Sequence, residues 1–246
     1  MLKRGKMKKY DTLQFRTDLD ALCIHLSDSQ IEQFLIYYDL LFEQNKVMNL
    51  TTITEYEDVL KKHFIDSMCL VKACELSVSM SLIDVGTGAG FPGLALKIAF
   101  PELKVTLLDS LKKRVLFLND VIRELGLKNV DAVHGRAEDL AKPGRLREKY
   151  DLCVSRAVAN LSTLSEYCLP FVKVGGLFIA YKSEKVFEEL SVSERSISLL
   201  GGELESQVDF TLPNSNIYRN LVVIRKKTKT SDRFPRKSGI PSREPL

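Results

Sequence analysis

The fold class of this chain is decided by one stretch of sequence, Leu82-Ile83-Asp84-Val85-Gly86-Thr87-Gly88-Ala89-Gly90-Phe91-Pro92-Gly93. It begins as a short apolar strand and continues into a turn that holds four glycines within eight residues. Glycine lets a backbone approach a ligand closely and adopt positive φ angles, so such a turn between a strand and a helix is typical of cofactor loops. A connection that binds nothing is the weaker interpretation, because so many glycines cost chain entropy.

Two cofactors compete for this turn. Gly88, Gly90 and Gly93 satisfy the G-x-G-x-x-G pattern of dinucleotide sites, and Asp109 follows at the end of the next expected strand. Asp84 favours S-adenosylmethionine instead, because a carboxylate there attracts its ammonium group but repels a pyrophosphate. Either interaction amounts to roughly 4 kcal/mol at ~4 Å before desolvation. Asp109 serves both cofactors, since it can accept hydrogen bonds from two ribose hydroxyls.

Strands and helices alternate through the second half of the chain. The expected strands that follow residues 82–85 cover residues 104–109, 130–133, 150–155 and 177–181. This alternation predicts right-handed crossovers and a mostly parallel sheet with helices on both faces. Residues 203–212 and 220–225 also read as strands, and the seven residues between them are too few for a parallel crossover. The expected fold is therefore α/β, a Rossmann-like doubly wound sheet with an antiparallel terminal hairpin.

The chain before the glycine turn reads as helical. Ser29-Gln30-Ile31-Glu32 matches a capping box, and an apolar stripe follows it. A second helical region is expected over residues 55–75. We expect three parts: residues 1–80 as an N-terminal basic arm and helical extension, residues 81–227 as the cofactor-binding core, and residues 228–246 as a basic, mainly irregular tail.

The composition excludes several classes of protein. With 45% hydrophobic and 28% charged residues, the chain matches an average globular protein. It has no run of ~18 apolar residues and no secretory signal, so no membrane contact and a cytoplasmic location are the default expectations. The five cysteines form no C-x-x-C pair, which supports neither a disulfide framework nor a zinc site. We expect no metal.

The charges are distributed unevenly along the chain. Residues 1–9 hold five basic side chains, and residues 220–246 hold eight basic and two acidic ones, although the net charge is +4. The rest of the chain is therefore acidic. The basic ends are either solvated termini or surfaces that bind a polyanion such as RNA. If residues 228–246 bind RNA, their removal lowers RNA affinity without affecting cofactor binding; alternatively, this tail packs on the sheet.

Further candidates lie where the third and fourth strands end. Ala137 and Glu138 follow the third strand, near where an adenine rests in this architecture. Ala137 offers a small apolar surface, whereas Glu138 either accepts a hydrogen bond or solvates a helix start. Arg156 ends the fourth strand at the mouth of the cleft, so we favour a functional role over that of a surface charge.

Six motifs of this chain resemble, in order and spacing, those of the ribosomal RNA small subunit methyltransferase G family, also called glucose-inhibited division protein B. The resemblance runs from about residue 30 to the C-terminus. The motifs are Asn49-Leu50-Thr51, His63-Phe64-Ile65-Asp66-Ser67, residues 84–98, Arg136-Ala137-Glu138, Val154-Ser155-Arg156-Ala157, and Phe234-Pro235-Arg236-Lys237-Ser238-Gly239-Ile240-Pro241.

The resemblance implies methyl transfer from S-adenosylmethionine to N7 of one guanine in 16S rRNA, within the small ribosomal subunit or an assembly intermediate. The cofactor contacts that it implies are Gly86, Phe91, Ala137, Glu138 and Arg156, in addition to Asp84, Gly88 and Asp109 from the residue pattern. Arg156 and Lys182 are candidate substrate contacts. Lys182 departs from the family pattern, because serine follows it where glycine is common, and it either touches RNA phosphate or solvates a strand end. A monomer is the default.

The chemistry of such a reaction agrees with the residues present. The lone pair of guanine N7 attacks a methyl group without losing a proton, so positioning and electrostatics suffice and no catalytic base is assigned. The chain has no Pro-Cys pair for pyrimidine methylation, and Cys153 lies within an apolar strand. His63 either orders RNA or makes a structural hydrogen bond. The alternatives are an NAD-dependent oxidoreductase that uses the overlapping glycine pattern and a non-enzymatic RNA-binding protein.

Overall fold

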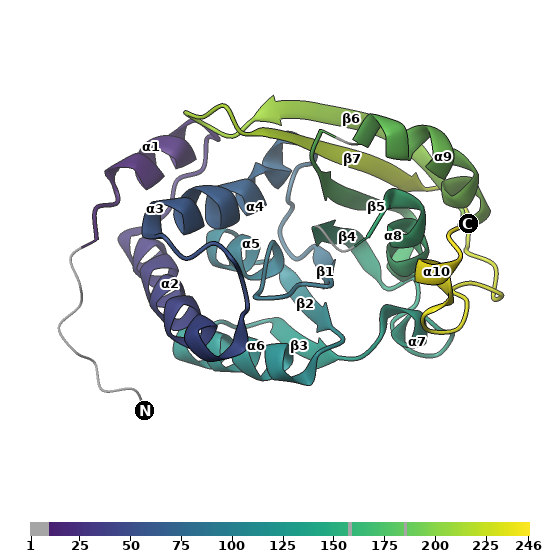
Figure 1. The fold of residues 1–246 in the computed structure, drawn as a ribbon, viewed down its shortest axis with the longest axis horizontal. Coiled ribbons are helices and arrows are strands. Elements are labelled where there is room, and N and C mark those ends of the chain that lie inside the picture. The colour runs from purple at the N-terminus through teal and green to yellow at the C-terminus, as the bar shows by residue number, and fades with distance from the viewer. Residues whose placement is uncertain (1–9, 157–158, 185) are drawn as a thin grey trace.

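The computed structural model describes residues 10–156, 159–184 and 186–246. Its centre is one seven-stranded sheet in the order β3-β2-β1-β4-β5-β7-β6 (Figure 1). The first five strands are parallel, and β7 lies antiparallel between β5 and β6. The expected Rossmann-like sheet with its terminal hairpin is therefore confirmed. The strands are β1 (Ser81–Val85), β2 (Lys104–Asp109), β3 (Val130–His134), β4 (Tyr150–Arg156), β5 (Val172–Lys182), β6 (Gly202–Thr211) and β7 (Tyr218–Lys226).

Helices cover both faces of the sheet, because successive side chains of a strand point to opposite sides. On β7, Leu221 and Val223 join one hydrophobic cluster, and Val222 and Ile224 join the other. The first cluster packs against α2, α5 and α6, and the second against α8 and α9. The longer helices are α1 (Leu13–Asp20), α2 (Asp28–Met48), α5 (Gly93–Ala99), α6 (Lys112–Glu124), α8 (Leu161–Cys168) and α9 (Val186–Leu199).

Helix α2 joins the N-terminal region to the same core as the sheet. The Gln30 side chain donates 2.7 Å to the carbonyl of Ile98 at the end of α5, and Gln33 donates 2.9 Å to the carbonyl of Leu125 at the end of α6. These amides satisfy carbonyls that a helix end leaves without intrahelical partners. Helix α2 thus holds two helices of the sheet domain in place.

The capping box of α2 lies two residues before the expected one. Ser27 accepts a hydrogen bond from the Gln30 backbone amide, and the Gln30 side chain accepts one from the Ser27 backbone amide. The prediction of Ser29 and Glu32 as the box was therefore wrong. Both pairs fit the serine-x-x-acceptor pattern, and the earlier start lets Gln30 reach α5 as well.

The second helical region of the N-terminal part is broken into several helix types. It consists of α3 (Tyr56–Val59), a π-helical segment (Leu60–Ile65), α4 (Asp66–Met68) and a final 3-10 turn (Cys69–Lys72). A π-helical turn shifts the direction of the following side chains, and such turns are frequent at functional sites. Here the segment contains the candidate residue His63 and directly precedes the acidic residue Asp66.

The C-terminal residues 228–246 lie against the second face of the sheet. They form turns and one short helix, α10 (Ile240–Arg243), on the right-hand side of Figure 1. Phe234 is buried in the cluster under α8 and α9. Within the described residues, none of the helices combines the length and apolar character needed to cross a lipid bilayer.

Candidate functional site

The glycine turn lies at the carboxyl edge of the parallel strands, where open α/β sheets bind ligands. Its glycines have different physical roles. A Cβ at Gly90 would come within 2.4 Å of the Tyr37 hydroxyl, and one at Gly93 within 2.9 Å of Asp84, so these two glycines permit close packing of α2 on the turn and of the start of α5 on β1. Gly88 has a φ of +62° and nothing within 4 Å of a built Cβ. The space above Gly88 is therefore open to a ligand.

Asp84 lies beneath this turn and is fully buried. Its Oδ2 accepts hydrogen bonds from the Thr87 hydroxyl at 2.6 Å and the Gly93 amide at 2.8 Å, so it fixes both ends of the turn. Its Oδ1 is buried without a hydrogen-bond partner among the described residues. Burial raises the pKa of Asp84 to about 6, against the lowering effect of the two hydrogen bonds. The side chain does not line the neighbouring cavity, so a direct ammonium contact stays a prediction.

Asp109, at the end of β2, lies between two cavities. It lines a cavity of about 380 Å³ formed with Gly86, Gly88 and Phe91, and a second cavity of about 280 Å³ formed with Ala137 and Glu138. Its carboxylate accepts hydrogen bonds from the backbone amides of residues 88 and 111, at 2.9 Å and 2.8 Å. The structure thus brings together Gly86, Gly88, Asp109, Ala137 and Glu138.

Glu138 is buried at the start of α7 (Ala137–Leu140) and is not a solvated helix-start residue. Its Oε1 accepts a 2.9 Å hydrogen bond from the backbone amide of Gly239 in the C-terminal segment. That partner was not expected, because a sequence gives no indication that residues 101 positions apart meet. Of the two readings of Glu138, the geometry favours the hydrogen-bond acceptor.

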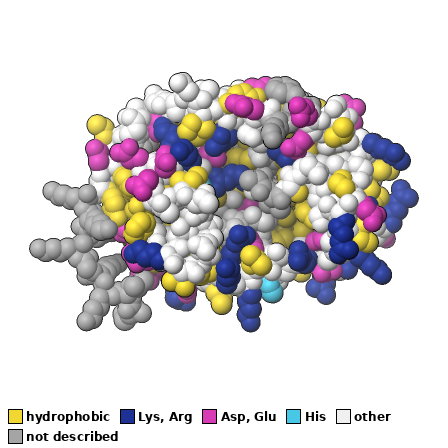
Figure 2. All heavy atoms as spheres, in the orientation of Figure 1, with side chains coloured by type: hydrophobic (Ala, Val, Ile, Leu, Met, Phe, Trp, Pro, Cys, Tyr) yellow, Lys and Arg dark blue, Asp and Glu magenta, His cyan; other side chains and the backbone are white. Residues whose placement is uncertain are grey.

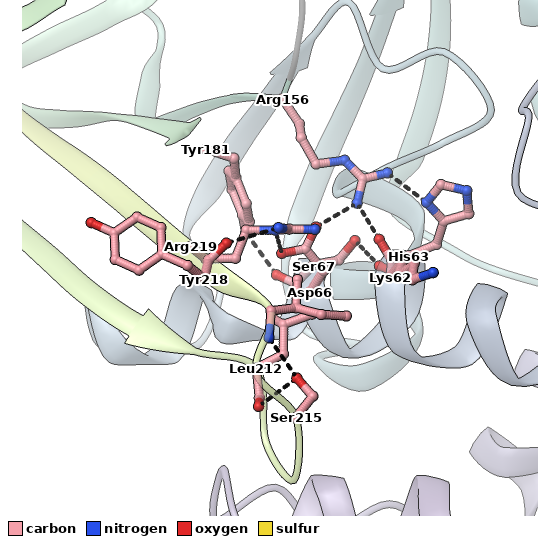
Figure 3. A network of polar contacts seen from close by, with 11 residues as sticks. Lys62, His63, Asp66, Ser67, Arg156, Tyr181, Leu212, Ser215, Tyr218 and Arg219 are labelled. Carbon is pink, nitrogen blue, oxygen red and sulfur yellow. Dashed lines mark hydrogen bonds and ion pairs between the residues drawn. The ribbon is translucent and has the colours of Figure 1, made fainter. Parts of the chain in front are cut away.

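Arg156 is the centre of a polar network that joins β4 to the helices before the glycine turn (Figure 3). Its Nη1 donates 3.1 Å to the Lys62 carbonyl and 3.1 Å to Oδ2 of Asp66. The other oxygen of Asp66 accepts a 2.9 Å hydrogen bond from Nε of Arg219. Asp66 is buried, so this carboxylate holds two arginines at one site. Sequence reasoning missed both Asp66 and Arg219 as functional residues, although Asp66 stands in a motif that resembles the family.

His63 lies in the same network and is electrically neutral. Arg156 donates 3.0 Å to its Nδ1, and an arginine can act as a donor alone, so Nδ1 carries no proton. The neutral ring then holds its proton on Nε2, which donates 2.9 Å to the Thr51 hydroxyl. Burial and the adjacent Arg156 charge lower the pKa of His63 to about 3. The geometry supports the structural reading of His63, which links the helices to Arg156.

Phe91 packs between these charged and aromatic groups. Its ring stacks on His63 with centroids 4.5 Å apart and an angle of 13°, and the Arg156 guanidinium lies 5.3 Å from the ring centroid. Tyr37 of α2 stacks on it at 5.3 Å. Phe91 therefore lines the 380 Å³ cavity as part of a rigid wall.

A third cavity, of about 620 Å³, adjoins the first and shares His63 and Arg156 with it. Lys182 lies at its wall, but its ammonium is bound. It donates 2.6 Å to Oε2 of Glu189 and 2.8 Å to the Ala159 carbonyl, and its side chain is 9% exposed. This geometry does not fit a solvated strand end, and a contact with RNA phosphate stays a prediction. An RNA phosphate would have to displace Glu189.

Cys153 lies in the interior of β4 and is fully buried. Burial and the neighbouring Cys168 raise the pKa of its thiol well above the usual range. The thiol is thus kept protonated in the core, as its place in an apolar strand indicates.

Comparisons with known proteins agree with this arrangement. A family profile described as rRNA small subunit methyltransferase G (GidB) matches residues 30–222. The Ribosomal RNA small subunit methyltransferase G of Lachnoclostridium phytofermentans is 52% identical over 236 residues, which cover 96% of this chain and 98% of that protein. The protein of the same name from Alkaliphilus metalliredigens is 52% identical over 225 residues, covering 92% of this chain and 94% of that protein.

Solved structures share the fold. A SAM-dependent methyltransferase from Aquifex aeolicus aligns with a TM-score of 0.52 at 18% identity and covers 72% of this chain and 96% of that one. TYW2 of M. jannaschii in complex with AdoMet aligns with a TM-score of 0.52 at 15% identity, and the alignment covers 70% of this chain and 77% of that one. These matches concern the fold alone. The sequence relatives favour a methyl donor over a dinucleotide, and the chain belongs to the rRNA small subunit methyltransferase G family.

Proposed function

We propose that this chain transfers the methyl group of S-adenosylmethionine to N7 of a guanine in 16S rRNA. The observation that carries the proposal is the row of three adjoining cavities at the carboxyl edge of the sheet. Asp109 is shared by the cavities of about 280 Å³ and 380 Å³, and Arg156 by those of about 380 Å³ and 620 Å³. Such a row offers separate places for an adenosine, an amino acid and an acceptor base.

The residues of the first two cavities fit S-adenosylmethionine. The open space above Gly88 lets a ligand approach the backbone of the turn closely. The buried carboxylate of Asp84 supplies negative charge under the turn. Asp109 is placed to accept hydrogen bonds from the ribose hydroxyls, and Ala137 and Glu138 to contact the adenine. When bound, this cofactor supplies an electrophilic methyl group on a positively charged sulfur.

The residues of the chain itself position the acceptor base. Because guanine N7 attacks with a lone pair and loses no proton, the residues need to hold the base in line with the methyl group and need not remove a proton. The cavity of about 620 Å³ beside Arg156 is the proposed place for the guanine. Arg156 is fixed there by Asp66 and His63, so its guanidinium meets the base in one orientation.

The proposed substrate is the 16S rRNA of the small ribosomal subunit or of an assembly intermediate, and we propose that the enzyme acts on it as a monomer in the cytoplasm. Basic side chains support this partner. Figure 2 shows Lys and Arg side chains gathered at the right-hand end of the molecule, the end at which Figure 1 shows α10. In the C-terminal segment that contains α10, Arg233, Lys237 and Arg243 are exposed. Residues 1–9 add five basic side chains but lie outside the described residues. RNA binding through such groups weakens as salt concentration rises.

The test is the modification state of 16S rRNA in cells that lack the gene. Mass spectrometry of nuclease digests should find one 7-methylguanosine fewer than in the parent strain, and the wild-type gene should restore it. A copy with Arg156→Ala should fail to restore it although the protein is present. Unchanged methylation after deletion would reject the proposed function.

A further inference from the structure

The C-terminal segment, residues 234–242, is anchored to the core by an ion pair between Arg236 and the buried carboxylate of Glu166. Glu166 in α8 is fully buried, and its carboxylate accepts hydrogen bonds from three nitrogen atoms of Arg236. The Arg236 backbone amide donates at 2.7 Å, Nε at 3.0 Å and Nη2 at 2.6 Å. A buried carboxylate that loses such a partner is left uncompensated, so the segment is held firmly.

From this anchor the segment runs to the adenosine end of the cofactor site. The Gly239 amide donates 2.9 Å to Oε1 of Glu138, and the Thr163 hydroxyl of α8 donates 2.9 Å to the Pro241 carbonyl. Ser242 lines the cavity of about 280 Å³ together with Asp109 and Glu138. The segment therefore contacts the same carboxylate that is expected to contact the cofactor.

We propose that residues 234–242 form a wall of the adenosine end of the cofactor site, with Arg236 as the positioning residue that holds this wall in place. The inference rests on the proposed function and deepens it. The Gly239 amide orients the Glu138 carboxylate, and Ser242 limits the width of the cavity. The positive charge of Arg236 is paired with Glu166, so Arg236 supports the cofactor site and does not bind RNA phosphate.

A binding experiment on the full-length protein tests this role. Titration calorimetry measures the affinity for S-adenosylhomocysteine and for 5′-methylthioadenosine, which retains the adenosine but lacks the amino-acid end. Arg236→Gln should weaken the binding of both compounds by the same factor, about tenfold, because the lost hydrogen bonds support the adenosine end. Lys229→Gln is the matched control, since it removes one exposed positive charge from the same C-terminal part and should leave both affinities unchanged.

Ser242→Phe tests the wall without touching its anchor. Residue 242 is exposed and lines the cavity, so a phenyl ring there should narrow the adenosine end of the site. The binding of both compounds should weaken about tenfold, and the melting temperature of the protein should stay unchanged. This variant decides the question if Arg236→Gln does not fold. Wild-type affinity in Ser242→Phe, or a loss in Arg236→Gln confined to S-adenosylhomocysteine, would overturn the inference. A wild-type protein that binds neither compound would instead overturn the proposed function, and this inference with it.

Discussion

Replacing Asp84 with asparagine removes the buried charge beneath the glycine turn but keeps an oxygen that can accept from Thr87 and Gly93. Asp84→Asn therefore separates two roles that alanine would confuse. One is the holding of the turn through hydrogen bonds at 2.6 Å and 2.8 Å. The other is the attraction of the cofactor's ammonium group by the negative charge.

The pKa of Asp84 sets the size and the sign of the expected effect. Because this pKa is raised to about 6, roughly nine-tenths of the molecules carry the charge at pH 7 but about one-tenth at pH 5. If the charged form binds the ammonium, affinity should fall about tenfold as the pH falls from 7 to 5. The free protein follows the opposite trend. Its Asp84 contributes about 3 kcal/mol of stability below pH 4, which is lost as the pH rises through 6.

Titration calorimetry with S-adenosylhomocysteine at pH 5 and pH 7 measures this directly. The wild type and Asp131→Asn, which removes an exposed carboxylate from β3, should both show the tenfold change. Asp84→Asn should bind with one weak affinity at both pH values. A wild-type affinity that does not change with pH, or an Asp84→Asn protein that follows the wild type, would refute the electrostatic role of Asp84.

Three further predictions concern packing, the arginine network and RNA. Gly90→Ala places a Cβ 2.4 Å from the Tyr37 hydroxyl, so the free energy of unfolding in urea should fall by about 3 kcal/mol. In Gly88→Ala it should fall by about 1 kcal/mol, and equal losses in the two variants would contradict the packing role of Gly90. Asp66→Ala leaves two arginines unpaired, so the free energy of unfolding should fall by about 3 kcal/mol and methyl transfer at least tenfold; a stable, fully active variant would disprove this. Deleting residues 2–9, which hold five basic side chains, should reduce the slope of log Kd for 16S rRNA against log salt by about 3.5, at about 0.7 for each charge. An unchanged slope would show that these residues do not contact the RNA.

The sheet and the cavities at its carboxyl edge could be predicted because their signals are local. The glycine turn after residues 82–85, the strand that ends at Asp109 and the short connection before β7 each restrict the chain within a few residues. The carboxyl ends of parallel strands meet at one edge, so the sequence alone predicts Asp109 and Arg156 at the same edge of the sheet.

The contacts within the site could not be predicted, because they join segments that are distant in sequence. Arg156 meets His63 across 93 positions, and Gly239 meets Glu138 across 101. That removing residues 228–246 leaves cofactor binding unaffected stays a prediction, and the Gly239–Glu138 contact is a reason to expect the opposite result. Lys182 reads as a free cation in the sequence, but the fold brings Glu189 to within 2.6 Å of it.

The most direct measurement is methyl transfer in vitro to small ribosomal subunits purified from a strain that lacks the gene. With S-adenosylmethionine labelled in its methyl group, the purified protein should incorporate about one label per subunit, recovered as 7-methylguanosine from 16S rRNA. Subunits from the parent strain should take up almost none, because their site is already modified. If deletion-strain subunits remain unlabelled, or if the label is recovered in another nucleoside, the assignment of guanine N7 in 16S rRNA is contradicted.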